Sequence, residues 1–131
     1  MRNFEIWTAD LPPLKNSQLK RGRRPVVIVS NDQSIEDSGF VSIVPLTKNL
    51  EGCQLPTHVL LCSRYLDYPS RALCEQVTTL DKACLVRRIG YVEDPFDRFA
   101  INRALSAQLH LAQTQMIYVQ KDNTYGYDWN V

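Results

Sequence analysis

The feature that most constrains the fold of this chain is a series of short β-type runs from Phe4 to Val92. No segment with a helical apolar repeat interrupts this series. The run at 4–11 alternates apolar and polar side chains, and the run at 24–32 is almost continuously apolar, as in a strand covered on both faces. The remaining runs lie at 40–47, 57–62, 71–80 and 84–92, separated by turn-forming segments such as 32–39. This succession predicts a mainly β fold, either a small antiparallel barrel or a strongly bent sheet.

One helix is expected after these runs. Asp94 before Pro95 forms an N-cap and first-turn pair, and Asp97 suits the positive end of the helix dipole. The apolar side chains from 96 onward form two adjacent stripes, and together they cover an arc too wide for one barrel face. The stripes are Phe96, Ala100, Ala104, Ala107 and Leu111, and Ile101, Leu105, Leu109, Ala112 and Met116. Either the helix is sunk deeply into its own domain, or a second chain covers the remainder.

Composition narrows the function classes. Fifteen basic residues against fourteen acidic ones give a net charge of +1, so binding to a polyanion has to depend on local clustering. The four cysteines form no CxxC pair and are expected to be buried reduced thiols, and with two histidines the chain predicts no metal centre. With no signal sequence or membrane-length apolar stretch, the chain is expected to be cytoplasmic.

Such clustering occurs in the segment KRGRRPVVIVSND, 20–32, where cationic side chains directly precede a core strand. The polar loop at 12–22 is longer than a tight hairpin needs, which is typical of a functional connection. A basic cluster is most often a solvated surface patch, but here it abuts the interior of the protein.

Five fragments, taken together and in this order, resemble the MazF/PemK family of toxin endoribonucleases from bacterial toxin–antitoxin pairs. They are EIWTADL (5–11), RPVVIVSND (24–32), VPLT (44–47), LPTHV (55–59) and CEQVTTLDK (74–82). The resemblance implies a small SH3-like antiparallel β-barrel with a C-terminal α-helix, of the MazF/PemK/CcdB-like kind. It also implies a homodimer that cuts single-stranded RNA at short sequences without a metal ion or other cofactor, and a cognate acidic antitoxin as partner.

The same resemblance assigns site residues. The family arginine falls on Arg24 and the family threonine on Thr47, both treated as catalytic, and Glu75 matches an acidic position linked to acid/base work. RNA-binding positions are expected at Ser17, Gln18, Lys20, Arg21, Arg23, Asn31, Ser70, Gln76 and Thr78.

Metal-free RNA cleavage needs a proton acceptor for the 2′-hydroxyl, a cation for the phosphorane and help for the leaving oxygen. The guanidinium of Arg24 matches phosphate geometry, and Thr47 offers a short hydroxyl donor. Glu75 would need a pKa raised by burial, yet a nearby Arg24 would lower it, so its role stays open. We expect His58 to be a hydrogen-bonded structural residue, and His110 to face water on the polar side of the helix.

The chain departs from the family pattern in the loop NSQLKRGR (16–23), which is about one residue longer than the family's loop and more basic. Cations at Lys20, Arg21 and Arg23 would strengthen salt-dependent attraction to phosphates. For this reason the cleavage sequence cannot be carried over from the family. Two other functions remain open: a non-enzymatic barrel toxin that docks on a protein such as a topoisomerase, and an RNA-binding barrel that does not cut.

Two regions are predicted, a barrel domain with its helix at 1–116 and an aromatic C-terminal tail at 117–131. Tyrosines and a tryptophan in the tail favour docking on another surface, although disorder is the usual state of a terminus.

Overall fold

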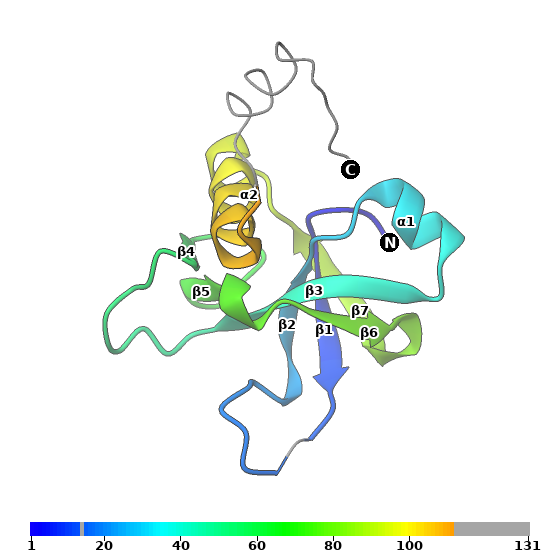
Figure 1. The fold of residues 1–131 in the computed structure, drawn as a ribbon, viewed down its shortest axis with the longest axis horizontal. Coiled ribbons are helices and arrows are strands. Elements are labelled where there is room, and N and C mark those ends of the chain that lie inside the picture. The colour runs from blue at the N-terminus through cyan, green and yellow to red at the C-terminus, as the bar shows by residue number, and fades with distance from the viewer. Residues whose placement is uncertain (14, 112–131) are drawn as a thin grey trace, which may run out of the picture.

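The computed structural model describes residues 1–13 and 15–111. Within these residues the chain forms seven strands, two α-helices and two short 3-10 helices, arranged as Figure 1 shows. Their order is β1 (Glu5–Leu11), β2 (Gly22–Ile28), α1 (Asp32–Asp37), β3 (Phe40–Thr47), β4 (His58–Leu61), β5 (Ser70–Leu73), η1 (Cys74–Gln76), β6 (Thr78–Asp81), η2 (Lys82–Cys84), β7 (Leu85–Tyr91) and α2 (Pro95–Leu109).

The strands form one antiparallel sheet that bends around β3. Its order is β4-β5-β3-β2-β1-β7, and β6 also pairs with β3. The N-terminal half of β3 pairs with β6, and its last residues pair with β5. The expected fold class, a mainly antiparallel β structure with a C-terminal helix, is therefore confirmed, with the sheet left open between β4 and β7.

The core lies on both faces of β2 and β3. Val27 packs in one cluster of buried side chains, which also receives Ile101 of α2. Val26 and Ile28 point to the other face and pack in a second cluster, together with Ile35 of α1. This arrangement explains why the run at 24–32 is almost continuously apolar, since each face of the strand has its own cover.

Two local features differ from the sequence prediction. The segment 32–39 was expected to be a turn, but it contains α1, which begins where the Asn31 side chain accepts a hydrogen bond from the Ser34 amide. The run 71–80 was expected to be one strand, but η1 divides it into β5 and β6. Both differences are short helices, which leave too few residues for a periodic pattern to be visible.

Helix α2 begins as predicted, with Asp94 accepting from the Phe96 amide and Pro95 in the first turn. It ends at Leu109, because His110 adopts a left-handed backbone with φ of 56° and acts as the C-cap. The prediction that His110 lies on the helix was thus wrong in detail, although the residue is exposed.

Helix α2 packs on β4 and η1, but only Ile101 and Ala104 are buried. Phe96 is 82% exposed and Phe99 61% exposed. The first of the two alternatives, a helix sunk deeply into its own domain, therefore does not hold for the described part of the chain. The second alternative, a covering chain, remains.

The cysteines are free thiols, but they are not all buried as expected. Cys74 is buried, which raises its pKa to about 12 through desolvation first and the charge of Glu75 second. Cys84 is partly buried, whereas Cys53 and Cys62 are exposed.

Neither α-helix in the described ranges has the length and apolar character needed to cross a bilayer. The predicted tail at 117–131, the domain boundary at 116, and Ala112 and Met116 of the expected helical stripe lie outside the described residues.

Candidate active site

Strand register brings Arg24 and Thr47 to the same place. Strands β2 and β3 are antiparallel, with Val26 opposite Pro45. Continuing this register past the end of the ladder sets Arg24 opposite Thr47. Directly opposed residues project their side chains to the same face of a sheet, within reach of a common ligand.

The two side chains line one cavity of about 500 Å³. Its wall comes from β2, from the end of β3 with the residues that follow, and from the segment leading into β5. The lining residues are Lys20, Arg23, Arg24, Pro25, Leu46, Thr47, Lys48, Asn49, Leu66, Asp67, Tyr68 and Ser70. Four of them are cationic and only Asp67 is anionic, so the cavity suits an anionic ligand although the whole chain is almost neutral.

Local hydrogen bonds prepare both candidate catalytic groups. The Arg24 Nε donates to the Arg21 carbonyl oxygen at 3.2 Å, which fixes the guanidinium while its terminal nitrogens stay available for phosphate oxygens. The Thr47 Oγ1 accepts from the Asn49 amide at 3.2 Å, so one lone pair is engaged and the hydroxyl proton remains for donation. Thr47 is buried at its strand end, where its position is well defined.

The basic loop is tied to the sheet by several contacts. Arg23 forms a two-point ion pair with Asp10, at 2.8 Å from Nε to Oδ1 and 3.1 Å from the terminal nitrogen to Oδ2. The hydrogen bond lowers the pKa of Asp10 and raises that of Arg23. Much of the Arg23 charge is therefore already compensated. The Lys20 amide donates to Gln76 Oε1 at 2.8 Å, which anchors the loop near β6.

Glu75 lies elsewhere. It lines a second, smaller cavity of about 220 Å³ beside the loop and β6, and Lys20 contributes to both cavities. Glu75 accepts from the Thr57 hydroxyl at 3.0 Å and bonds to His58 Nε2 at 2.8 Å. Burial alone would raise the pKa of Glu75, but hydrogen bonds from His58, its own backbone amide and Thr57 outweigh this effect and lower it. Arg24 is not among the causes, and the structure does not bring Glu75 into the cavity of Arg24 and Thr47.

His58 is hydrogen-bonded through both ring nitrogens. The Leu55 amide donates to Nδ1 at 3.1 Å, so this nitrogen carries no proton. In the neutral ring Nε2 then holds the proton and donates it to Glu75. The expectation of a hydrogen-bonded structural histidine is confirmed.

The other predicted RNA-binding residues fall into three groups. Ser70 lies in the main cavity, buried at the start of β5. Gln76 and Thr78 line the smaller cavity with Glu75. Asn31 caps α1 and belongs to neither cavity, while Ser17 and Gln18 lie in the loop, where the Ser17 hydroxyl accepts from the Leu19 amide.

Sequence reasoning missed four residues of the main cavity that carry polar groups on their side chains. Lys48 and Asn49 directly follow Thr47, so their proximity could have been inferred from position alone. Asp67 and Tyr68 come from the segment between β4 and β5, and no motif marked them. Only the pairing of β5 with the end of β3 brings that segment to the site.

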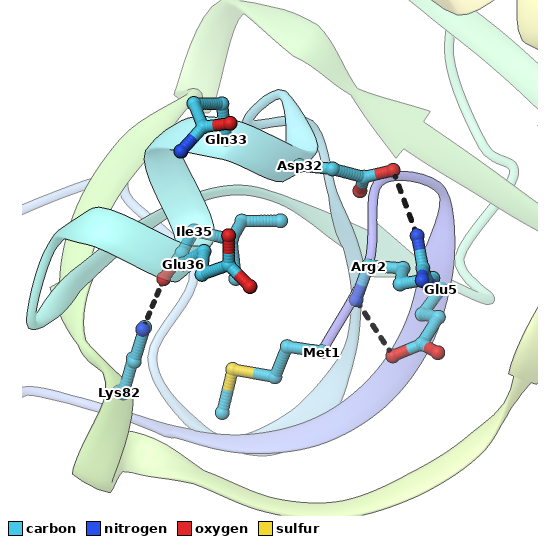
Figure 2. Close-up of a pocket in the computed structure, with 8 residues that line it drawn as sticks. All are labelled: Met1, Arg2, Glu5, Asp32, Gln33, Ile35, Glu36 and Lys82. Atoms are coloured by element: carbon cyan, nitrogen blue, oxygen red, sulfur yellow. Dashed lines mark hydrogen bonds and ion pairs between the residues drawn. The ribbon is translucent and has the colours of Figure 1, made fainter.

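A further cavity of about 680 Å³ lies between the N-terminus, α1 and η2 (Figure 2). Its charged groups are largely engaged in contacts within the protein. The Arg2 guanidinium pairs with Asp32, and the Arg2 backbone amide donates to the Glu5 carboxylate. Lys82 donates to the Ile35 carbonyl oxygen. Lys82 lies beside the beginning of β3, whereas Thr47 is at its end. This cavity is thus separate from the candidate active site.

No group of three or more histidine, cysteine, aspartate or glutamate side chains suited to a metal ion occurs within 1–13 and 15–111.

Comparison with known proteins identifies the class. The family model of the PemK-like, MazF-like toxin of type II toxin–antitoxin systems matches residues 2–109, and the chain belongs to this family. The resemblance drawn from the sequence fragments is therefore confirmed.

Individual relatives agree with this assignment. The chain is 36% identical over 113 residues to the endoribonuclease MazF of Staphylococcus saprophyticus, covering 85% of this chain and 92% of that protein. Among solved structures, a mycobacterial endoribonuclease in complex with its cognate antitoxin is 25% identical, with a TM-score of 0.70, over 86% of this chain and 98% of that one. MazF from Deinococcus radiodurans has a TM-score of 0.73 at 17% identity, over 85% of this chain and 97% of that one, and this match concerns the fold alone.

Proposed function

We propose that this chain, a MazF-type toxin endoribonuclease of a type II toxin–antitoxin system, cuts single-stranded RNA without a metal ion and uses Arg24 and Thr47 at the scissile phosphate. The observation that carries the proposal is the shared cavity of these two side chains, which come from neighbouring strands and lie among an excess of cationic groups. A cytoplasmic location, with access to messenger RNA, is part of the same proposal.

In the proposed reaction the 2′-hydroxyl oxygen of the nucleotide before the cut attacks phosphorus as its proton passes to water, and the bond to the 5′-oxygen breaks as that oxygen takes up a proton from water. The products are a 2′,3′-cyclic phosphate and a 5′-hydroxyl. Arg24 stabilises the additional negative charge on the phosphorane, and the Thr47 hydroxyl donates a hydrogen bond to a non-bridging oxygen while keeping its proton. Both groups are held on strands, so little reorganisation is needed during the reaction.

Glu75 has a different proposed role. Its lowered pKa and its bonds to Thr57 and His58 make it a weak proton acceptor. We assign it to holding the segment around His58 against η1, and proton transfer at the phosphate is assigned to water.

The activity test is incubation of the purified protein with a defined single-stranded transcript in EDTA, followed by mapping of the cut ends. The wild type should cut and leave 5′-hydroxyl ends. Arg24→Ala and Thr47→Val should each lower the rate by about 10²-fold or more, because each removes one preorganised donor. RNA that stays uncut by the wild type both in EDTA and with an added divalent cation would refute the nuclease, whereas cutting that appears only with the cation would refute metal independence.

Arg23→Ala is the matched control for Arg24→Ala. The Arg23 guanidinium lines the same cavity but is engaged by Asp10, so its removal should weaken RNA binding only slightly and leave the cleavage step at saturating RNA little changed. If toxicity in cells survives both Arg24→Ala and Thr47→Val, docking on a protein target becomes the better explanation.

Two partners belong to the proposal. A cognate acidic antitoxin would occupy the cationic cavity, a role supported by the antitoxin present in the complex of the mycobacterial relative. A second copy of the chain would cover the exposed aromatic side of α2, where Phe96 and Phe99 are unprotected in the described chain.

A further inference from the structure

The wall of the main cavity carries an exposed aromatic ring next to an ammonium group. Tyr68 is 60% exposed, and the Lys48 Nζ lies over its ring at 5.2 Å from the ring centroid. Both side chains line the cavity that contains Arg24 and Thr47. Such a cavity offers both kinds of contact that a single RNA strand uses. The exposed ring can stack on a base, and the cationic side chains can bind phosphates.

The ring is mounted on a fixed support. Ser70, buried at the start of β5, donates its hydroxyl proton to the Tyr68 carbonyl oxygen at 3.0 Å. Pro69, between them, restricts the backbone further. Preorganisation of this kind lowers the entropy cost of holding a base, since the tyrosine backbone is already placed.

The position of Lys48 in the chain shows that the Tyr68 ring lies near the Thr47 hydroxyl. Lys48 follows Thr47 directly, so its ammonium group and the ring beside it belong to the same end of β3 as the Thr47 hydroxyl. A base attached to a nucleotide at the scissile phosphate can therefore reach the ring within one cavity of about 500 Å³.

We infer that Tyr68 is a stacking platform for a base that flanks the scissile phosphate, and that Lys48 binds the adjoining phosphate. The inference rests on the proposed RNA cleavage, and it assigns these two residues to positioning the strand. Base stacking on aromatic side chains is the usual means of holding single-stranded RNA, and its loss typically costs about tenfold to a hundredfold in binding.

The test is a double-mutant cycle in which one change is made in the protein and the other in the RNA. Tyr68→Ala should lower kcat/KM about tenfold or more on a short oligonucleotide that spans the mapped cut, and Tyr68→Phe should restore it because the phenyl ring still stacks. An abasic nucleotide on one side of the scissile phosphate should harm the wild type similarly. Tyr68→Ala combined with that abasic substrate should lose little more than either change alone. Two substrates, abasic before or after the cut, identify which base stacks.

Lys48→Gln addresses the phosphate contact. It should reduce the slope of log affinity against log salt by about one, in line with the loss of one phosphate contact.

Phe40→Ala is the matched control for the aromatic ring. Phe40 is 58% exposed at the opposite end of β3, roughly 23 Å from Thr47 at about 3.3 Å per residue. Its removal should leave cutting unchanged. Equal activity of Tyr68→Ala and the wild type, or fully additive losses with both abasic substrates, would overturn the inference while the nuclease stands.

A binding measurement separates the inference from the cleavage proposal. Fluorescence anisotropy with a mixed-sequence single-stranded RNA, made resistant by 2′-O-methylation, should show weaker binding by Tyr68→Ala than by Tyr68→Phe. If the wild type binds this RNA but does not cut the unmodified RNA of the same sequence, the nuclease fails and this difference still supports the platform. Equal binding by the two variants, or no binding by the wild type, overturns it.

Discussion

At the scale of single residues, the carboxylate of Glu75 shows how its neighbours determine what a side chain can do. The sequence offered a possible acid/base residue, but both of its oxygens meet donors, from Thr57 on one side and His58 on the other. Its pKa is lowered in spite of partial burial. The group is therefore better suited to holding structure at neutral pH than to accepting a proton.

A pH dependence of stability follows from that lowered pKa. Because the folded-state pKa of Glu75 lies below its usual 4.5, the ionised carboxylate stabilises the fold fully above that value. This contribution is lost as the pH falls through the folded-state pKa. We expect Glu75→Gln to be less stable than the wild type at pH 7, with the difference shrinking in urea unfolding experiments below about pH 4.5.

Thr57→Val provides the control for the Glu75 prediction. It removes one of the donors but keeps the carboxylate, so it should produce a smaller change of the same sign. A difference between Glu75→Gln and the wild type that stays constant from pH 7 to pH 3 would contradict the assignment.

The family motif marks Arg24 and Thr47 as candidate site residues, and the β2–β3 register explains why their side chains share one cavity. Tyr68 was not predictable. A lone tyrosine between Asp67 and Pro69 has no distinguishing pattern, and its relevance depends on the pairing of β5 with the end of β3.

At the scale of elements, β7 constrains the segment that carries Tyr68. A side chain at Gly90 would run into the ring of Tyr65, which lies in the segment between β4 and β5 and also packs on Tyr91 with ring centroids 5.4 Å apart. Glycine at position 90 therefore allows the segment to lie close to the sheet.

Gly90→Ala should destabilise the protein by about 1–3 kcal/mol, because overpacking forces a rigid aromatic ring to move. It should also slow RNA cutting through displacement of the segment that carries Tyr68. Chemical denaturation and the cleavage assay measure the two effects. Gly39→Ala is the control: nothing lies near its added methyl group, so its stability should change by less than about 0.5 kcal/mol.

Elements of ordinary length were predictable, whereas the shortest ones were not. The alternating and continuous apolar runs identified the strands, and the Asp94–Pro95 pair identified the start of α2. Helix α1 has six residues and η1 has three, fewer than a periodic pattern needs to become apparent. The early end of α2 depends on one backbone angle at His110, which composition does not reveal.

At the scale of the whole molecule, α2 leaves exposed the side that the proposed second copy of the chain would cover. The sequence correctly showed that this helix has more apolar surface than one sheet face can cover. It could not decide between self-burial and a partner, because that depends on where the helix packs. With Phe96 82% exposed, the described chain leaves the surplus uncovered.

We therefore expect Phe96→Glu to shift a dimer to monomers in analytical ultracentrifugation, since it places a charge where the apolar contact is proposed. The isolated fold should be unaffected because Phe96 contributes little to its core. Gln108→Glu adds the same charge at another exposed position of the helix and should leave the dimer intact. A Phe96→Glu variant that still sediments as a dimer would place the interface elsewhere.

Strand β3 holds Thr47 in place more firmly than a loop could. It hydrogen-bonds to β2, β5 and β6, and Thr47 is its last residue. Partial opening of an edge of the molecule leaves such a strand in place, because freeing it requires several ladders to break together. The hydroxyl should accordingly share the cooperativity of global unfolding, and thermal fluctuations that loosen the surrounding loops would change access for RNA long before they disturb the threonine itself.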